Sequence, residues 1–123
     1  MAYLNRVELI GHLGKDPEIR IFPDGTPVAS VSVATTEYYK DKESGERKDI
    51  TQWHNITVTG KKAEFIKEYI KKGSFVFISG KLSYRSYEKD GQKKFLTEIV
   101  LNDFTGDIQI LDKKEADPTN GLV

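Results

Sequence analysis

The amino-acid sequence predicts an all-β fold with one helix, arranged as a five-stranded Greek-key barrel with extended hairpins. Apolar and polar residues alternate along several segments, which is typical of half-buried strands. One segment between the third and fourth long strands, residues 61–72, has helical spacing instead. Gly11 interrupts the first alternating segment, and a glycine there indicates a bulge or a sharp bend. Strands in this order, with a bent first strand, favour a closed barrel over an open sheet.

The first half of the chain is predicted to contain three strands and one long charged loop. Turn residues separate these segments and set their ends. In chain order they are a strand over residues 7–13 that ends at Asp16-Pro17, a short strand over 18–22 closed by a turn at 23–25, a β-branched strand over 28–36, and the charged loop over 40–49.

The second half is predicted to contain the helix and the remaining strands. The helix presents Ala63, Ile66, Tyr69 and Ile70 on one face, and Gly73 follows it as a C-cap. The other segments are strands over residues 53–59, 75–87, 95–100 and 107–111, a hairpin turn over 88–92 centred on Asp90-Gly91, and a connection over 101–106 outside the sheet. This order matches the oligonucleotide-binding type of Greek-key barrel.

The length of 123 residues predicts a single domain with a real core. We assign residues 1–111 to the barrel domain. Residues 112–123 lack any periodicity, so they are predicted to form a short flexible C-terminal end.

The composition indicates a cytoplasmic protein with no membrane partner. No apolar run approaches the roughly 18 residues of a membrane span, and the N-terminus lacks the order of a signal peptide. The chain has no cysteine, which excludes disulfides and thiolate metal sites and fits a reducing compartment.

No constellation of residues predicts catalysis, a metal site or a cofactor. His12 and His54 are isolated, and the carboxylates are scattered among basic residues. Residues 11–15 resemble a phosphate loop only faintly, because they lack its spacing and no helix follows them. We therefore expect a binding protein and not an enzyme.

The side chain of Trp53, the only tryptophan, is predicted to point to solvent. Ile56 and Val58 share one face of their strand, and Trp53 falls on the opposite face together with Asn55. Two alternatives remain open, namely a bulge that shifts the phase at Trp53 and a second subunit that covers the ring.

Residues 75–87 repeat this arrangement on a second strand. Lys81, Arg85 and Tyr87 fall on the face opposite the apolar residues. Aromatic rings interleaved with cations are what an unpaired nucleic-acid strand requires, since bases stack on the rings and phosphates attract the cations. The two strands together therefore favour a nucleic-acid partner.

The net charge is zero, but its distribution is uneven. Residues 61–94 hold 10 basic and 4 acidic residues, whereas the rest of the chain is acidic. Local potential and not net charge governs the encounter with a polyanion. The alternative is that the lysines of residues 61–72 merely form the solvated face of the helix.

Several motifs resemble the bacterial single-stranded-DNA-binding proteins, with nearly unbroken register from residue 5 to residue 111. They are Asn5-Arg6-Val7, the run from Gly11 to Arg20, Ala34-Thr35, Tyr39, Trp53-His54, Gly60-Lys61, Ala63-Glu64, Tyr69, Lys72-Gly73-Ser74 and Gly80-Lys81-Leu82. The resemblance implies the barrel inferred above, working as a homotetramer at the nucleoid. It also implies sequence-independent binding and protection of single-stranded DNA in replication, recombination and repair.

The resemblance implies roles for individual residues as well. It assigns base stacking to Tyr39, Trp53 and Tyr87, and it places the N-terminal strand and His54 near subunit contacts. We accordingly expect the following sets: phosphate contacts from Arg6, Lys61, Lys62, Lys81 and Arg85, and subunit contacts from Leu4, Arg6, Glu8 and His54.

The sequence also departs from the family pattern. Tyrosine stands at positions 39 and 87 where the best-known members have tryptophan, and Thr59 stands where many carry a stacking phenylalanine. The acidic C-terminal tip through which the family recruits replication and repair proteins is absent, so that recruitment is not expected here. The runner-up interpretation is a barrel of the same fold that serves as a protein-interaction module, such as a replication-restart adaptor.

Overall fold

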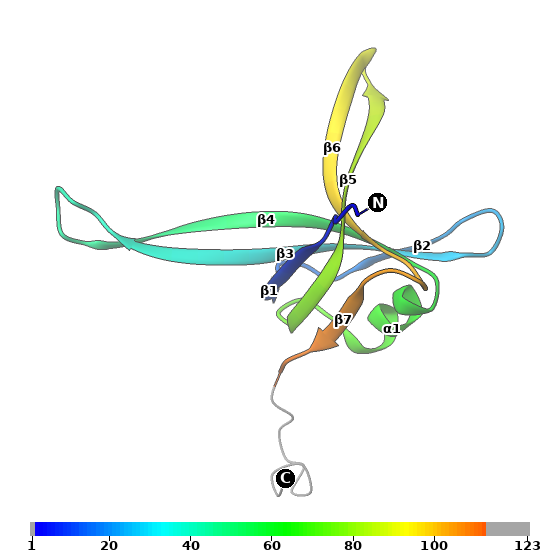
Figure 1. Cartoon of the computed structure of the whole chain (residues 1–123), viewed down its shortest axis with the longest axis horizontal. Coiled ribbons are helices and arrows are strands. Elements are labelled where there is room, and N and C mark those ends of the chain that lie inside the picture. The colour runs from blue at the N-terminus through cyan, green and yellow to red at the C-terminus, as the bar shows by residue number, and fades with distance from the viewer. Residues whose placement is uncertain (1, 113–123) are drawn as a thin grey trace, which may run out of the picture.

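The computed structural model describes residues 2–112 of the chain (Figure 1). Seven strands and one helix follow one another along this part. They are β1 (Val7–Leu13), β2 (Glu18–Ile21), β3 (Pro27–Lys40), β4 (Arg47–Thr59), α1 (Lys61–Tyr69), β5 (Phe75–Lys89), β6 (Gln92–Leu101) and β7 (Asp107–Ile110).

Five of these strands close into a barrel, which confirms the predicted fold class. The strand order is β1, β3, β4, β6, β5, and β5 pairs with β1 again to complete the ring. All of these pairings are antiparallel except that of β4 with β6. The short strands β2 and β7 add to β3 and β5 outside the ring.

Gly11 lies where the barrel closes. β1 pairs with β5 from Val7 to His12 and crosses to β3 at His12 and Leu13. A Cβ atom at Gly11 would overlap the carbonyl oxygen of Ala34 on β3. The predicted bend is therefore found here, and glycine is required because the backbones of β1 and β3 approach so closely.

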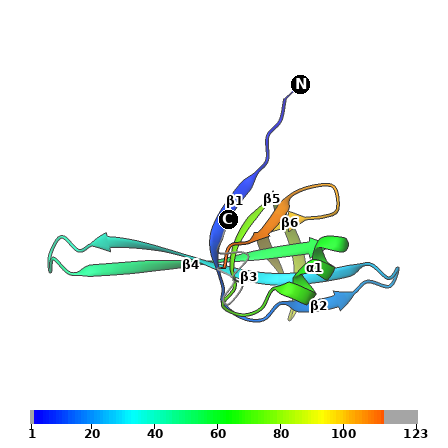
Figure 2. The same ribbon diagram turned by 90° about the horizontal axis from the view of Figure 1, so that it is seen from below.

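The barrel core consists of the inward-facing residues of the five strands, together with one face of α1. The predicted alternation is confirmed on β4 and β5, where Ile56, Val58, Val76 and Ile78 are buried. The helix contacts β3 and β4 beside the barrel (Figure 2). Three helix-region residues complete the core, namely Ala63, Ile66 and Ile70.

Two long hairpins extend beyond the barrel as arms that point in different directions (Figure 1). We call them the β3–β4 arm and the β5–β6 arm. The β5–β6 arm turns at Asp90-Gly91, as predicted, and both residues have positive φ angles of 53° and 76°. The tight two-residue hairpin turn that this dipeptide favours requires a positive φ at both residues.

The predicted charged loop over residues 40–49 is too long. β3 and β4 remain paired as far as Lys40 and Arg47, so only residues 41–46 connect them. A strand ladder needs no apolar anchor, because backbone hydrogen bonds and cross-strand side chains stabilise it. The guanidinium of Arg47 lies 4.2 Å from the centre of the Tyr38 ring. In the connection, a hydrogen bond from Ser44 holds the pKa of Asp41 below its ordinary value.

The predicted helix is also too long, because α1 ends at Tyr69 and not at residue 72. Ile70 turns to an extended conformation and enters the core. The backbone that follows the helix is held by a side chain from another segment. Asp16 accepts a hydrogen bond from the Lys72 N–H at 2.8 Å. Gly73 is therefore not the C-cap. Tyr69, predicted to face the core, is exposed.

The predicted C-terminal end lies almost wholly outside the described residues. Its first residue, Asp112, accepts a hydrogen bond from the Phe75 N–H at 3.1 Å. Within the described part of the chain, no helix has the length and apolar character needed to cross a membrane.

Candidate nucleic-acid interface

Trp53 presents an exposed ring at the base of the β3–β4 arm. Its residue surface is 59% exposed, which confirms the outward orientation predicted for it. The register of β3 and β4 is unbroken from Val28 opposite Thr59 to Lys40 opposite Arg47, which excludes a bulge at this strand pair. The indole lies against Gly14, where a Cβ atom would overlap ring atoms Cζ3 and Cη2. The backbone at Gly14 thus supports the ring from one side.

A polar groove lies where β3 and β4 face β5 and β6. It has a volume of about 130 Å³. Outward-facing hydroxyl and amide groups from β3 and β4 form much of its lining, and a charged wall comes from β5 and β6. We call this feature the groove and define it by its lining residues, namely Lys15, Glu18, Ser30, Val31, Ser32, Asn55, Ile56, Thr57, Arg85, Leu96 and Glu98.

Glu98 holds the wall of the groove in place. Its side chain is only 7% exposed, and it accepts hydrogen bonds from the Thr57 hydroxyl at 2.7 Å and from the Arg85 Nε–H at 3.0 Å. In the sequence, Glu98 is one of several carboxylates scattered among basic residues. The predicted turn at Asp90-Gly91 could have located it, because that turn sets the register that places Arg85 opposite Leu96 and near Glu98.

Tyr87 continues the groove wall along the β5–β6 arm. It lies two residues from Arg85, on the same face of β5, and directly opposite Lys94 of β6. Both side chains are exposed. Sequence reasoning missed Lys94 as an individual residue, although it belongs to the basic segment 61–94. An aromatic ring and a cation are therefore neighbours here.

Tyr39 lies farther out, near the end of the β3–β4 arm. It is exposed and stands opposite Lys48, whose ammonium pairs with Asp41 at 3.3 Å. By strand alternation Tyr39 falls on the opposite side of the ribbon from Trp53. The structure therefore does not bring the three predicted stacking residues onto one face. Tyr38, which sequence reasoning missed, is exposed on the side of Trp53.

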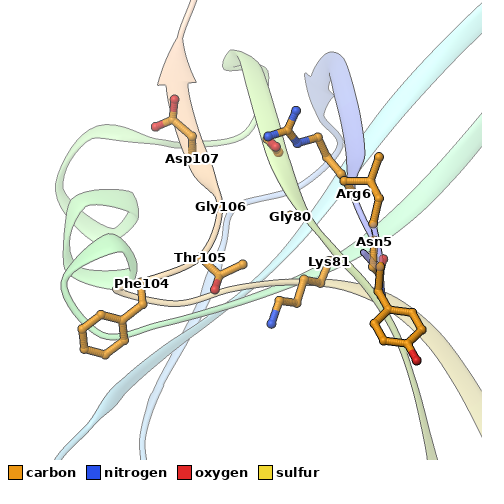
Figure 3. Close-up of a pocket in the computed structure, with 11 residues that line it drawn as sticks. Asn5, Arg6, Gly80, Lys81, Phe104, Thr105, Gly106 and Asp107 are labelled. Atoms are coloured by element: carbon orange, nitrogen blue, oxygen red, sulfur yellow. The ribbon is translucent and has the colours of Figure 1, made fainter. Parts of the chain in front are cut away.

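The predicted phosphate-binding residues divide among three places. Arg85 lies in the groove wall. Arg6 and Lys81 line a second hollow of about 660 Å³ between the N-terminal segment, β5 and the loop before β7 (Figure 3). Lys61 and Lys62 lie at the start of α1, where the Lys62 ammonium donates a hydrogen bond to the carbonyl oxygen of Asn102 at 2.7 Å.

The residues predicted for subunit contacts surround β1. Leu4, Arg6 and Glu8 are exposed. His54 is half-buried, and its Nε2 lies 2.8 Å from the hydroxyl oxygen of Thr35. It lines a third hollow, of about 260 Å³, together with Val7, Leu9, Trp53, Asn55, Leu82, Thr97, Glu98 and Ile99.

The chemistry offered by these surfaces is stacking, hydrogen bonding and charge. Among residues 2–112, no three histidine, aspartate or glutamate side chains gather closely enough to hold a metal ion. In the same part of the chain, every buried side-chain nitrogen and oxygen has a hydrogen-bond partner.

Comparisons with known proteins agree on one family. Residues 4–109 match the model of the single-strand binding protein family. The chain is 44% identical over 116 residues to single-stranded DNA-binding protein 1 of Xylella fastidiosa (strain 9a5c), covering 94% of this chain and 82% of that protein.

Two solved structures have the same fold. The Plasmodium falciparum SSB complex with ssDNA matches with a TM-score of 0.82 and 37% identity, covering 91% of this chain and 98% of that one. A deletion mutant of the single-stranded DNA binding protein from Thermus aquaticus matches with a TM-score of 0.73 and 32% identity. That match covers 90% of this chain and 52% of the other.

The contact between Gly14 and Trp53 leads to a prediction. The substitution Gly14→Ala should displace the indole, because the added Cβ atom would overlap the ring. We expect the emission spectrum of Trp53 to change while the far-ultraviolet circular dichroism of the barrel stays the same. Ser86→Ala, on the other arm, is the control and should leave the emission unchanged. An unaltered spectrum in Gly14→Ala would show that the ring does not rest on this glycine.

Proposed function

The chain belongs to the single-strand binding protein family, and we propose that it binds single-stranded DNA without regard to sequence. The observation that carries the proposal is the exposed ring of Trp53, supported by Gly14 and two residues from Asn55, which lines the groove. Every base has a π-face, so a ring held in this way binds bases without selecting among them. The Plasmodium falciparum structure, which was solved with single-stranded DNA, supports the same partner.

We assign the stacking role to Trp53 at the base of the β3–β4 arm, to Tyr39 farther out on the same arm, and to Tyr87 on the β5–β6 arm. Stacking contributes roughly 1–3 kcal/mol per base. Tyr39 lies on the other side of its arm from Trp53. A DNA strand that stacks on both rings therefore has to pass around the arm or across a second subunit.

We assign phosphate contacts first to Lys94, because it lies directly opposite a stacking residue. Lys48 has the same relation to Tyr39, although Asp41 already pairs with it. Arg6 and Lys81 remain proposed contacts in the second hollow. Lys61 and Lys62 at the start of α1 also remain proposed phosphate contacts, for a DNA strand that extends past the barrel.

Binding of this kind implies a role for the protein in the cell. The protein covers unpaired strands and thereby protects them during replication, recombination and repair, at the nucleoid. It acts by binding and not by catalysis.

We further propose that the protein is a homotetramer. Along Val7–Gly11, β1 pairs with β5 on one edge only, because its pairing with β3 is confined to His12 and Leu13. Large apolar side chains near this strand are exposed, among them Leu4 and Ile10. An open strand edge with exposed apolar residues is a surface on which a second copy can pair symmetrically.

The assembly can be tested at His54. We expect light scattering to give four times the 14.0 kDa chain mass for the parent protein at micromolar concentration. His54→Tyr should shift the protein toward smaller species, because the larger ring would not fit the hollow beside Val7 and Leu9. Gln92→Tyr, at the tip of the β5–β6 arm, is the control and should remain tetrameric. A parent mass of one chain would contradict the proposal.

Stacking and charge can be separated by their dependence on salt. Trp53→Ala should weaken binding of a labelled thymine oligomer by roughly one to two orders of magnitude at every salt concentration. Lys94→Gln should instead flatten the slope of log K against log salt by about 0.7, the value for one phosphate of a single strand. Fluorescence anisotropy of the oligomer measures both effects. A change mainly in the slope for Trp53→Ala would show that our roles are misassigned.

A further inference from the structure

We propose that Glu98 is a positioning residue that removes Arg85 from the phosphate-binding cations and directs its guanidinium at the bases. This inference rests on the proposed binding of single-stranded DNA and concerns the wall of the groove. It differs from the expectation drawn from the sequence, which assigned Arg85 to phosphate.

The charge of the groove disfavours a phosphate contact at Arg85. The groove lining contains two cations, Lys15 and Arg85, and two carboxylates, Glu18 and Glu98, so its formal net charge is zero. Each cation lies near a carboxylate, at 3.0 Å in the pair of Arg85 with Glu98 and at 4.0 Å in the other pair. A cation that is already paired neutralises little of a phosphate charge, and a carboxylate held at the wall repels phosphates.

The burial of Glu98 fixes the orientation of Arg85. Its side chain is 7% exposed, whereas that of Arg85 is 55% exposed. The carboxylate therefore cannot follow the arginine outward, and it fixes the Nε side of the guanidinium against the barrel. Thr57 fixes the carboxylate in turn, through the hydrogen bond to its second oxygen. Such a pair has little freedom to rearrange toward a passing phosphate.

Most hydrogen-bond donors of Arg85 lie outside its pair with Glu98. A guanidinium carries five N–H groups, and the hydrogen bond to Glu98 uses the one on Nε. The others belong to the exposed end of the side chain. Tyr87 lies two residues away on the same face of β5, so a base stacked on its ring has its edge near Arg85. The carbonyl oxygens of thymine and guanine accept hydrogen bonds from such donors, whereas adenine has no carbonyl oxygen and offers ring nitrogens instead.

The substitution Glu98→Gln isolates the charge of the pair. Glutamine can accept the hydrogen bond from Arg85 and donate to the Thr57 hydroxyl, which can act as an acceptor, so both contacts can persist. The loss of the carboxylate leaves Arg85 with an uncompensated charge that can neutralise a phosphate. We expect the slope of log K against log salt for a thymine oligomer to become steeper by about 0.7. A purely structural role for Glu98 would weaken binding without steepening the slope.

Two matched variants complete the test. Arg85→Gln in the parent protein should leave the slope unchanged, and the double variant Glu98→Gln with Arg85→Gln should return it to the parent value. A slope that flattens by about 0.7 in Arg85→Gln alone would overturn the inference, because Arg85 would already neutralise a phosphate. An unchanged slope in a folded Glu98→Gln variant would also overturn it. If Glu98→Gln does not fold, the slope of Arg85→Gln decides alone.

The base-directed role of Arg85 has a separate readout. Arg85→Gln should reduce the ratio of affinities for thymine and adenine oligomers, because only thymine offers carbonyl acceptors. Self-stacking of adenines is the same for both proteins, so the change in the ratio reports the protein alone. An unchanged ratio would overturn the base-directed role. Failure of the parent to bind any single strand at low salt would instead overturn the proposed function.

Discussion

The structure depends on the close approach of β1 and β3 at Gly11. Because this residue has no side chain, β1 can pair with β5 along most of its length and then cross to β3, which closes the ring of five strands. The same crossing carries the chain to Gly14, against which the Trp53 indole rests. β3, β4, β5 and β6 are longer than the ring itself requires, and their ends project as the two arms (Figure 1). The crossing of β1 thus serves both the barrel core and the support of the Trp53 ring.

Much of the fold could be predicted from the sequence because the relevant signals are local. Alternation along β4 and β5 separates Ile56, Val58, Val76 and Ile78 from the outward residues, and burial follows that separation. The dipeptide Asp90-Gly91 sets its turn through the backbone preferences of its own two residues. The outward orientation of Trp53 follows from the alternation of its strand alone, so this part of the candidate site could also be predicted from the sequence.

The rest depends on contacts between distant segments. The chain leaves the helical path at Ile70, which enters the core, and Asp16 binds the Lys72 N–H beyond it across 56 residues of sequence. The length of the β3–β4 arm depends on pairing through a polar stretch whose composition resembles a loop. Tyr69 matched the helical spacing of the core but is exposed, and its ring contacts that of Phe65, which is half-buried against the core. The pair of Glu98 and Arg85 requires the register of a hairpin, which composition alone does not provide.

In the proposed binding mode, exposed rings stack on bases and lysines on the arms contact phosphates. The most direct test of its central claim is the fluorescence of Trp53 during titration with a thymine oligomer, compared with the same oligomer annealed to its complement. The account predicts strong quenching by the single strand at low salt. It predicts little quenching by the duplex, because paired bases remain within their own stack. Unchanged emission with the single strand, or equal quenching by both, would contradict the claim and favour a protein-interaction module of the same fold.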